Sequence, residues 1–391
     1  MLAALLGGCA TVDEPAPSPR RKARAATAAD RPPAVPEVDR VLVDYRSGVS
    51  ALRRGDDAEA KAKFDDAIAR IGGIIANDEQ AARARGLFSA EREKPFIGEP
   101  YERVMAYYYR GILYWRDGQP DNARACFRSG QVIDSDVGKD AYAADYVLLD
   151  YLDGLVSARL AADGSDALAR ARAHAAGRVT LPDYNPAANV LIFAEYGQGP
   201  RKFAAGQYGE QLRFRTEESV TRAARLILEE GRRVVPLPAF DDLNFQATTR
   251  GGRVMDHILG NKAVFKAATN VAGDVALMGS AVAAQEARRR AMTGRDDSSA
   301  SNTAIGLGLL GVVGKVVSAA TQTQADTRQW DNLPQRLSFA AVKLPPGDYR
   351  GRIEFIDRNG AVLAARTRSV AFTVPAEAGR DTVVFLSELP R

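Results

Sequence analysis

The chain has 391 residues, of which 46% are hydrophobic and 26% charged, so it is long enough for two or three globular domains. The formal net charge of +4 is small, and the arginines are scattered, whereas nucleic-acid-binding proteins concentrate basic residues beside aromatics. Two cysteines and two histidines leave little material for a disulfide, a metal site or a histidine-based triad. We therefore expect no metal, no cofactor and no nucleic-acid partner.

The first nine residues end in an apolar and small-residue pattern before a cysteine. The run Leu6-Gly7-Gly8-Cys9 resembles the lipobox of bacterial lipoproteins, in which the cysteine is acylated and becomes the mature N-terminus. Only eight residues without Lys or Arg precede Cys9, fewer than a working signal peptide needs, so we expect the natural start to lie upstream. The resemblance implies a lipid anchor at Cys9. Ala10, in place of aspartate, is compatible with the periplasmic face of an outer membrane.

Residues 10–37 are rich in Pro and Arg and carry too few apolar side chains to bury a core. This composition predicts a disordered tether with an average span on the order of 30 Å. Two interpretations of its basic residues stay open: they bind anionic lipid headgroups, or they only keep the tether soluble.

From residue 38 to residue 180 the pattern is helical and Ala-rich, and small and aromatic residues recur at tetratricopeptide spacing. One copy comprises Tyr107, Gly111, Tyr114, Gly118, Ala123, Phe127 and Gly130. A copy sixty-three residues earlier comprises Gly48, Gly55, Ala60, Phe64 and Ala67, and a weaker third comprises Ser157, Leu160, Gly164, Ala169 and Ala176. We expect stacked helix pairs with a concave groove, and a buried, packing role for Cys126.

Residues 181–261 and 323–391 read as the two parts of a β-rich domain. Apolar and alternating runs predict strands over 189–197, Gln211–Arg215, Arg233–Leu237, 337–344, 350–357, 361–374 and 381–389, with a helix over 216–230. The turn at 344–349, with sequence LPPGDY, resembles that of small β-sandwich modules of the transthyretin type.

Residues 262–322 are Gly/Ala-rich with helical periodicity and predict a helical hairpin inserted between the two β parts. Its GxGxxG at 306–311 lacks the preceding strand that dinucleotide binding requires. Charged residues interrupt both arms, so packing within the protein or an oligomer, membrane contact and a flexible segment all stay open. The predicted fold class is α+β: tetratricopeptide-like helices, then a sandwich-like β-rich domain interrupted by this hairpin.

Two groups of residues are candidates for binding. The first lies at the edge of the helical groove and comprises Tyr107, Tyr108, Tyr114, Trp115, Glu99 and Arg103, as contacts for a partner protein or peptide. Its acidic member Glu99 has an alternative role at a helix start, where it complements the dipole. The second is a turn with Glu195, Arg201 and Lys202, which offers charges to a ligand or forms a tight turn with solvated charges. No GxSxG, HExxH or paired CxxC occurs, so no enzyme is predicted.

The lipobox, residues 98–128, the strand–turn at 193–202 and the segment 325–337 leading into LPPGDY together resemble a family of uncharacterised bacterial lipoproteins with tetratricopeptide-like N-terminal halves. This resemblance implies an envelope component whose partners are envelope proteins, including those of cell-wall synthesis. The expected function is a lipid-anchored scaffold or adaptor that binds a partner through its helical repeats. The alternative is an oligomeric component of an envelope or secretion assembly that uses the Gly-rich hairpin.

Overall fold

The protein contains both helices and sheets, which confirms the α+β class. A computed structural model describes residues 35–77, 94–135, 143–160, 163–207, 209–229, 232–249, 324–377 and 379–390. The expected lipobox, nearly all of the expected tether and the expected Gly/Ala-rich hairpin lie outside these residues. The described residues from Pro36 onwards belong to one compact unit.

Consecutive helices pack against each other in pairs, and neighbouring pairs touch along the chain. The pairs are α1 (Arg40–Arg54) with α2 (Asp57–Asn77), α4 (Pro100–Arg116) with α5 (Pro120–Asp134), and α6 (Val147–Arg159) with α7 (Ser165–Ala175). A short 3-10 turn, η2 (Glu37–Asp39), precedes α1. Helices α4 and α5 each begin with proline, whose missing N–H costs nothing at the first helical position.

The first two pairs share the same glycine–phenylalanine contact. A Cβ atom on Gly48 would lie 3.0 Å from the ring of Phe64, and one on Gly111 would lie 2.5 Å from the ring of Phe127. Each glycine therefore lets the phenylalanine of the second helix pack against the backbone of the first. Cys126, beside Phe127, is buried with a free thiol, as expected.

The predicted register of the third pair is wrong for its last two members, because Ala169 and Ala176 are exposed. Gly164, also predicted, does make a close contact, since it abuts the backbone of Gly154. The other close contact comes from Gly154, where a Cβ would lie 2.9 Å from that of Ala167. The α6–α7 connection thus shifts the small residues of α7 away from the spacing of the first two pairs.

The strands in the described part of the chain form two four-stranded sheets and one two-stranded ribbon. The central sheet has the order β10 (Thr382–Ser387), β1 (Val190–Gln198), β7 (Pro334–Val342), β6 (Ala239–Asp242). The outer sheet has the order β5 (Arg233–Leu237), β4 (Thr221–Leu228), β8 (Gly347–Asp357), β9 (Arg368–Val374). The ribbon pairs β2 (Arg201–Ala205) with β3 (Gln211–Arg215), and a short helix, α8 (Leu243–Thr248), follows β6.

The helix predicted over 216–230 is wrong, because strand β4 occupies Thr221–Leu228. Ala224, Leu226 and Leu228 alternate along β4 and enter the core between the sheets, and β5 and β8 pair with its two edges. Pairing on both sides outweighs the helical propensity of this Arg- and Leu-rich segment. The strand predicted over 361–374 is also shorter than expected, since a 3-10 turn, η6 (Ala364–Arg366), precedes β9.

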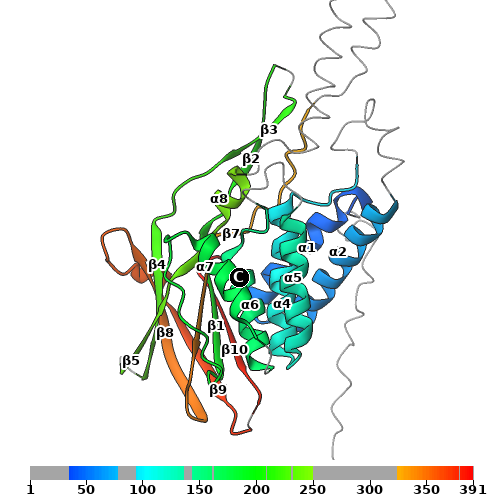
Figure 1. Ribbon diagram of the computed structural model, residues 1–391. Coiled ribbons are helices and arrows are strands. Elements are labelled where there is room, and N and C mark those ends of the chain that lie inside the picture. Colours follow the sequence, from blue (N-terminus) through cyan, green and yellow to red (C-terminus); the bar gives the residue numbers. More distant parts are fainter. Residues whose placement is uncertain are drawn as a thin grey trace, which may run out of the picture. The chain divides into compact units, whose positions relative to one another are not determined.

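Strand β1 is buried on both faces and lies between two apolar cores (Figure 1). Its residues Leu191 and Phe193 belong to the core shared with the helices, whereas Ile192 and Tyr196 belong to the core shared with the outer sheet. The order of layers is therefore helices, central sheet, outer sheet. Among the described helices, none is long and apolar enough to cross a membrane.

Candidate functional site

Two aromatic residues predicted to contact a partner lie instead in the core between the helices and the central sheet. Tyr108 is 0% exposed and its ring lies 6.3 Å from that of Phe193 in β1. Trp115 is 1% exposed, and its indole Nε1 donates a hydrogen bond of 2.8 Å to Asp381. The prediction is wrong for both, because the chain's own sheet covers the face of α4 that carries them.

Tyr107 and Tyr114 lie two turns apart on another face of α4 and are half-buried. Arg110 lies between them in the sequence, and its guanidinium is 3.5 Å from the centre of the Tyr114 ring. The same guanidinium donates two hydrogen bonds, of 2.6 and 3.1 Å, to the carboxylate of Asp65 in α2. Of the four predicted aromatic contacts, these two tyrosines keep accessible surface.

Glu99 is the N-cap residue of α4, and Arg103 lies in the first turn of this helix. The backbone N–H of Glu99 donates a 2.7 Å hydrogen bond to Glu102, which matches the helix-start interpretation of this segment. Arg103 is only 8% exposed. Both residues therefore have positions that serve the fold, and neither offers a large surface to a partner.

Glu195 was predicted to lie at a ligand-binding turn. Its buried carboxylate instead accepts hydrogen bonds from the helices and from the central sheet. One carboxylate oxygen accepts from Arg53 Nε at 2.6 Å and Ser387 Oγ at 2.7 Å, and the other accepts from Tyr109 at 2.6 Å. Burial would lower the pKa of Arg53, but the adjacent carboxylate raises this pKa above its ordinary value. Burial and the same carboxylate raise the pKa of Tyr109, which keeps the phenol protonated as a donor.

Lys202 makes a second buried ion pair, with Glu102 of α4, at 2.5 Å. Burial raises the pKa of Glu102, and the ammonium of Lys202 opposes that effect. Arg201 is exposed, with its guanidinium 3.9 Å from Asp331. Glu195 and Lys202 form ion pairs with different buried partners, so the prediction of a ligand-binding turn is wrong. Both ion pairs connect helices to strands.

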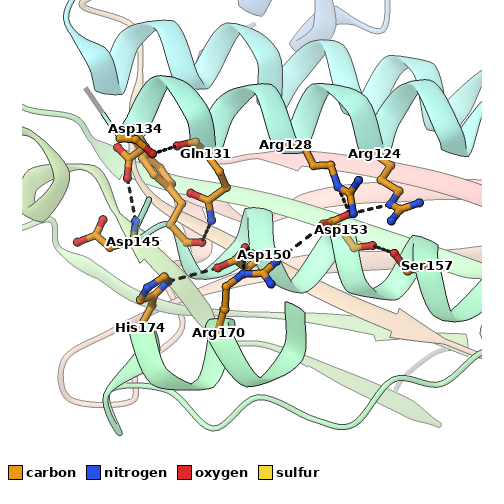
Figure 2. A network of polar contacts seen from close by, with 12 residues as sticks. Arg124, Arg128, Gln131, Asp134, Asp145, Asp150, Asp153, Ser157, Arg170 and His174 are labelled. Atoms are coloured by element: carbon orange, nitrogen blue, oxygen red, sulfur yellow. Dashed lines mark hydrogen bonds and ion pairs between the residues drawn. The ribbon is translucent and has the colours of Figure 1, made fainter. Parts of the chain in front are cut away.

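A different group of charges connects three helices, as Figure 2 shows. We name it the three-helix charge cluster. It consists of Arg124 and Arg128 on α5, Asp150 and Asp153 on α6, and Arg170 and His174 on α7. The cations are four residues apart on α5 and on α7, so both pairs face the central helix that carries the two carboxylates.

The two aspartates of the three-helix charge cluster are buried, whereas its arginines reach solvent. Asp153 accepts from Arg124 Nε at 2.8 Å and from Arg128 Nε at 2.9 Å, and its side chain is 6% exposed. Asp150 accepts from Arg170 at 3.3 Å and is equally buried. The side chains of Arg128 and Arg170 are 57% and 51% exposed. Each arginine therefore bonds to a buried carboxylate through part of its guanidinium, while the rest of its side chain is exposed to solvent.

His174 completes the cluster, with its Nδ1 3.3 Å from the second carboxylate oxygen of Asp150. The hydrogen bond with Asp150 raises the pKa of His174, and partial burial opposes the rise. Asp145 also acts on the pKa of His174, and Asp134 and Asp145 belong to the same polar network, so four carboxylates face three arginines and His174. The exposed edges of Arg128 and Arg170 are available to an anionic group from outside the chain.

Sequence reasoning missed this cluster, although one signal for it exists. Asp150 and Asp153 interrupt the apolar run VLLDYLDGLV, and a carboxylate inside a buried helix must be paired. That pattern indicates that cations from neighbouring helices surround α6. It does not identify which arginines do so, because the sequence contains many.

The described residues hold no group of three or more His, Cys, Asp or Glu side chains that could bind a metal. Searches of family models, curated proteins and solved structures gave no match to this chain. The function therefore has to be argued from the site itself.

Proposed function

We propose that this protein is a lipid-anchored, non-enzymatic adaptor of the cell envelope that binds an acidic segment of a partner protein on the three-helix charge cluster. The observation that carries the proposal is a set of arginines fixed by buried carboxylates at an accessible surface. Arginine recognises carboxylates through paired hydrogen bonds, and fixing its side chain in advance lowers the entropy lost on binding.

The location of the binding surface differs from the one expected of helical repeats. The glycine–phenylalanine contact common to the first two helix pairs supports a tetratricopeptide-like assignment, and the two facing sheets support a sandwich-like one. In such a layer of helix pairs, the face carrying Tyr108 and Trp115 would hold a peptide. Here the central sheet covers that face, so the partner is assigned to the opposite, arginine-bearing side of the helices.

The anchor part of the proposal depends on Cys9 and on the resemblance to a lipobox. Mass spectrometry of the mature protein from a bacterial envelope should find Cys9 as an acylated N-terminal residue. The variant Cys9→Ser should leave the membrane fraction. An unmodified Cys9 in the mature chain would remove the anchor from the proposal without affecting the charge cluster.

The binding part is tested with the double variant Arg128→Gln, Arg170→Gln. Each aspartate keeps one cationic partner, Arg124 for Asp153 and His174 for Asp150, so the fold should be preserved. Binding of a fluorescent poly-glutamate peptide should weaken about tenfold for each arginine removed, since a charge-assisted hydrogen bond contributes at least about 1.5 kcal/mol.

The matched control is Arg350→Gln, Arg358→Gln, which removes the same charge from two exposed positions of the outer sheet, one near the start of β8 and one just after its end. A photo-crosslinker at Val132, which is 72% exposed and one turn beyond Arg128, should give adducts in the envelope that the cluster variant loses and the control keeps. Equal peptide binding by the two double variants would contradict the proposal.

A further inference from the structure

One face of the β2–β3 hairpin carries three arginines and a phenylalanine, all exposed. Arg201 and Phe203 alternate along β2, and Arg213 and Arg215 alternate along β3, so these four side chains lie on the same face. Phe203 is 40% exposed. We name these four residues the arginine face of the hairpin.

The register of the hairpin places like charges opposite each other. Arg201 is the direct partner of Arg215, and Phe203 is the direct partner of Arg213. Like charges at opposed positions destabilise a strand pair. Asp331 lies 3.9 Å from Arg201 but is itself 42% exposed, so it screens the repulsion weakly. Within the face, the guanidinium of Arg215 lies 5.9 Å from the centre of the Phe203 ring, and Arg213 donates a 2.7 Å hydrogen bond to Gln211. Neither contact neutralises a positive charge, so the arginine face is complementary to an anionic surface.

The opposite face fixes the hairpin to the rest of the protein. Lys202 is 2% exposed and pairs with Glu102, and its backbone N–H donates to the side chain of Gln329 at 2.5 Å. Phe214 packs edge-on against Tyr101, with ring centres 5.8 Å apart. An isolated two-stranded ribbon is marginally stable, so these contacts hold the arginine face in a defined orientation.

The hairpin lies at the end of the protein where the N-terminal chain joins the folded unit. The segment 324–330 connects the two: Ala325 donates to the carbonyl of Gly209 at 2.7 Å, and Arg328 donates to the carbonyl of Val38 at 3.2 Å. Three residues of extended chain span at most about 10 Å. Figure 1 shows this segment, in amber, beside β2 and β3. Val38, near the start of the compact unit, is therefore linked to the hairpin through this segment.

We propose that the arginine face docks on anionic lipid headgroups, with Phe203 entering the interfacial region of the bilayer. The proposal rests on the proposed function in one respect, because a lipid on Cys9 would bring this end of the protein to the membrane. Arginines supply attraction to anionic lipids, and an aromatic ring between them suits the boundary of headgroups and acyl chains. An acidic protein segment would engage the arginines, whereas a bilayer interface would also take up the exposed ring of Phe203.

The test uses the full chain with Cys9→Ser, so that acylation plays no part, and vesicles of phosphatidylglycerol and phosphatidylcholine against phosphatidylcholine alone. The variant Arg213→Gln, Arg215→Gln should partition about 30-fold less strongly into anionic vesicles, since each basic residue near the surface contributes roughly fivefold. The control Arg350→Gln, Arg358→Gln removes equal charge and should change partitioning little. Basic residues of the 10–37 segment are present in every variant, so their contribution cancels.

A second readout is the emission of Phe203→Trp. Trp115 and Trp330 are each 1% exposed, so a new tryptophan on the hairpin reports separately. With anionic vesicles its emission should move to shorter wavelength and be quenched by brominated acyl chains. Equal partitioning of the two double-arginine variants would overturn the proposal, as would unchanged emission of Phe203→Trp on bound vesicles or a shift with poly-glutamate alone. The cluster variant Arg128→Gln, Arg170→Gln should bind vesicles normally, which separates failure of this proposal from failure of the adaptor function.

Discussion

At the scale of single residues, two buried ion pairs connect the helices to the strands. Glu195 on β1 meets Arg53 on α1, and Lys202 on β2 meets Glu102 on α4, each pair with both side chains almost completely buried. A buried ion pair adds little stability relative to an apolar pair, but removing one partner leaves a buried charge without compensation. These contacts therefore fix which side chains meet between the layers.

The substitution Glu195→Gln should destabilise the protein by about 3–5 kcal/mol, because Arg53 would remain buried without its counter-ion. Urea titration followed by circular dichroism measures the change in free energy of unfolding. The control Glu59→Gln breaks the neighbouring pair with Arg54, whose side chains are 46% and 39% exposed, and should cost under about 1 kcal/mol. Similar losses of unfolding free energy for the two variants would contradict the role of the Arg53–Glu195 pair in connecting α1 to β1.

At the scale of elements, glycine positions decide how closely helices pack. The space for a Cβ at Gly111 is taken by the ring of Phe127, whereas Gly72 in α2 has nothing within 4 Å of the same position. Both glycines lie inside helices with ordinary helical backbone. A comparison of the two positions therefore distinguishes the effect of close packing at Gly111 from the low helix propensity that both glycines share.

We expect Gly111→Ala to destabilise the protein by about 1–3 kcal/mol, since the added methyl group displaces Phe127 from a filled core. Gly72→Ala should be neutral or stabilising by up to about 1 kcal/mol, because alanine favours the helix. Thermal unfolding of the two variants beside the unmodified protein gives the comparison. A stabilising effect at both positions would mean that α4 and α5 can separate without loss.

At the scale of the whole molecule, the central sheet is the element on which both other layers depend. Asp241 at the β6 edge illustrates this: its carboxylate accepts from the backbone N–H groups of Val147 at 3.0 Å and Leu148 at 2.8 Å, at the start of α6. Burial raises the pKa of Asp241 to about 7, and the two hydrogen bonds oppose the rise. The contact between sheet and helices is therefore sensitive to pH.

Because the folded protein holds this proton up to about pH 7 while the unfolded chain releases it near pH 3.9, stability should fall as the pH rises between these values. The loss amounts to at most about 4 kcal/mol. The difference in unfolding free energy between unmodified protein and Asp241→Asn should thus decrease from pH 5 to pH 8. His174, whose raised pKa acts in the same direction above about pH 6.5, is removed by repeating the comparison in a His174→Gln background. A difference that is constant with pH would contradict the assignment.

Local patterns were sufficient to predict much of the secondary structure. The small-residue spacing around Gly48 and Gly111 predicted two helix pairs, and short apolar or alternating runs predicted β1, β3 and β5. These features depend on contacts within a short stretch of chain. Strand β4 was missed because its own residues do not reveal that β5 and β8 pair with it, and β8 is more than a hundred residues away in the sequence.

The candidate sites were predicted less well, for a related reason. Which face of α4 is accessible depends on the sheet that packs against it, and no property of Tyr108 or Trp115 distinguishes them from Tyr107 and Tyr114 in the sequence. The sequence by itself determined the α+β class and the candidate lipid anchor, because composition and local periodicity carry that information. Only the tertiary structure decided that the predicted groove is closed and that arginines gather on α5, α7 and the β2–β3 hairpin, because surfaces form from residues brought together by long-range packing.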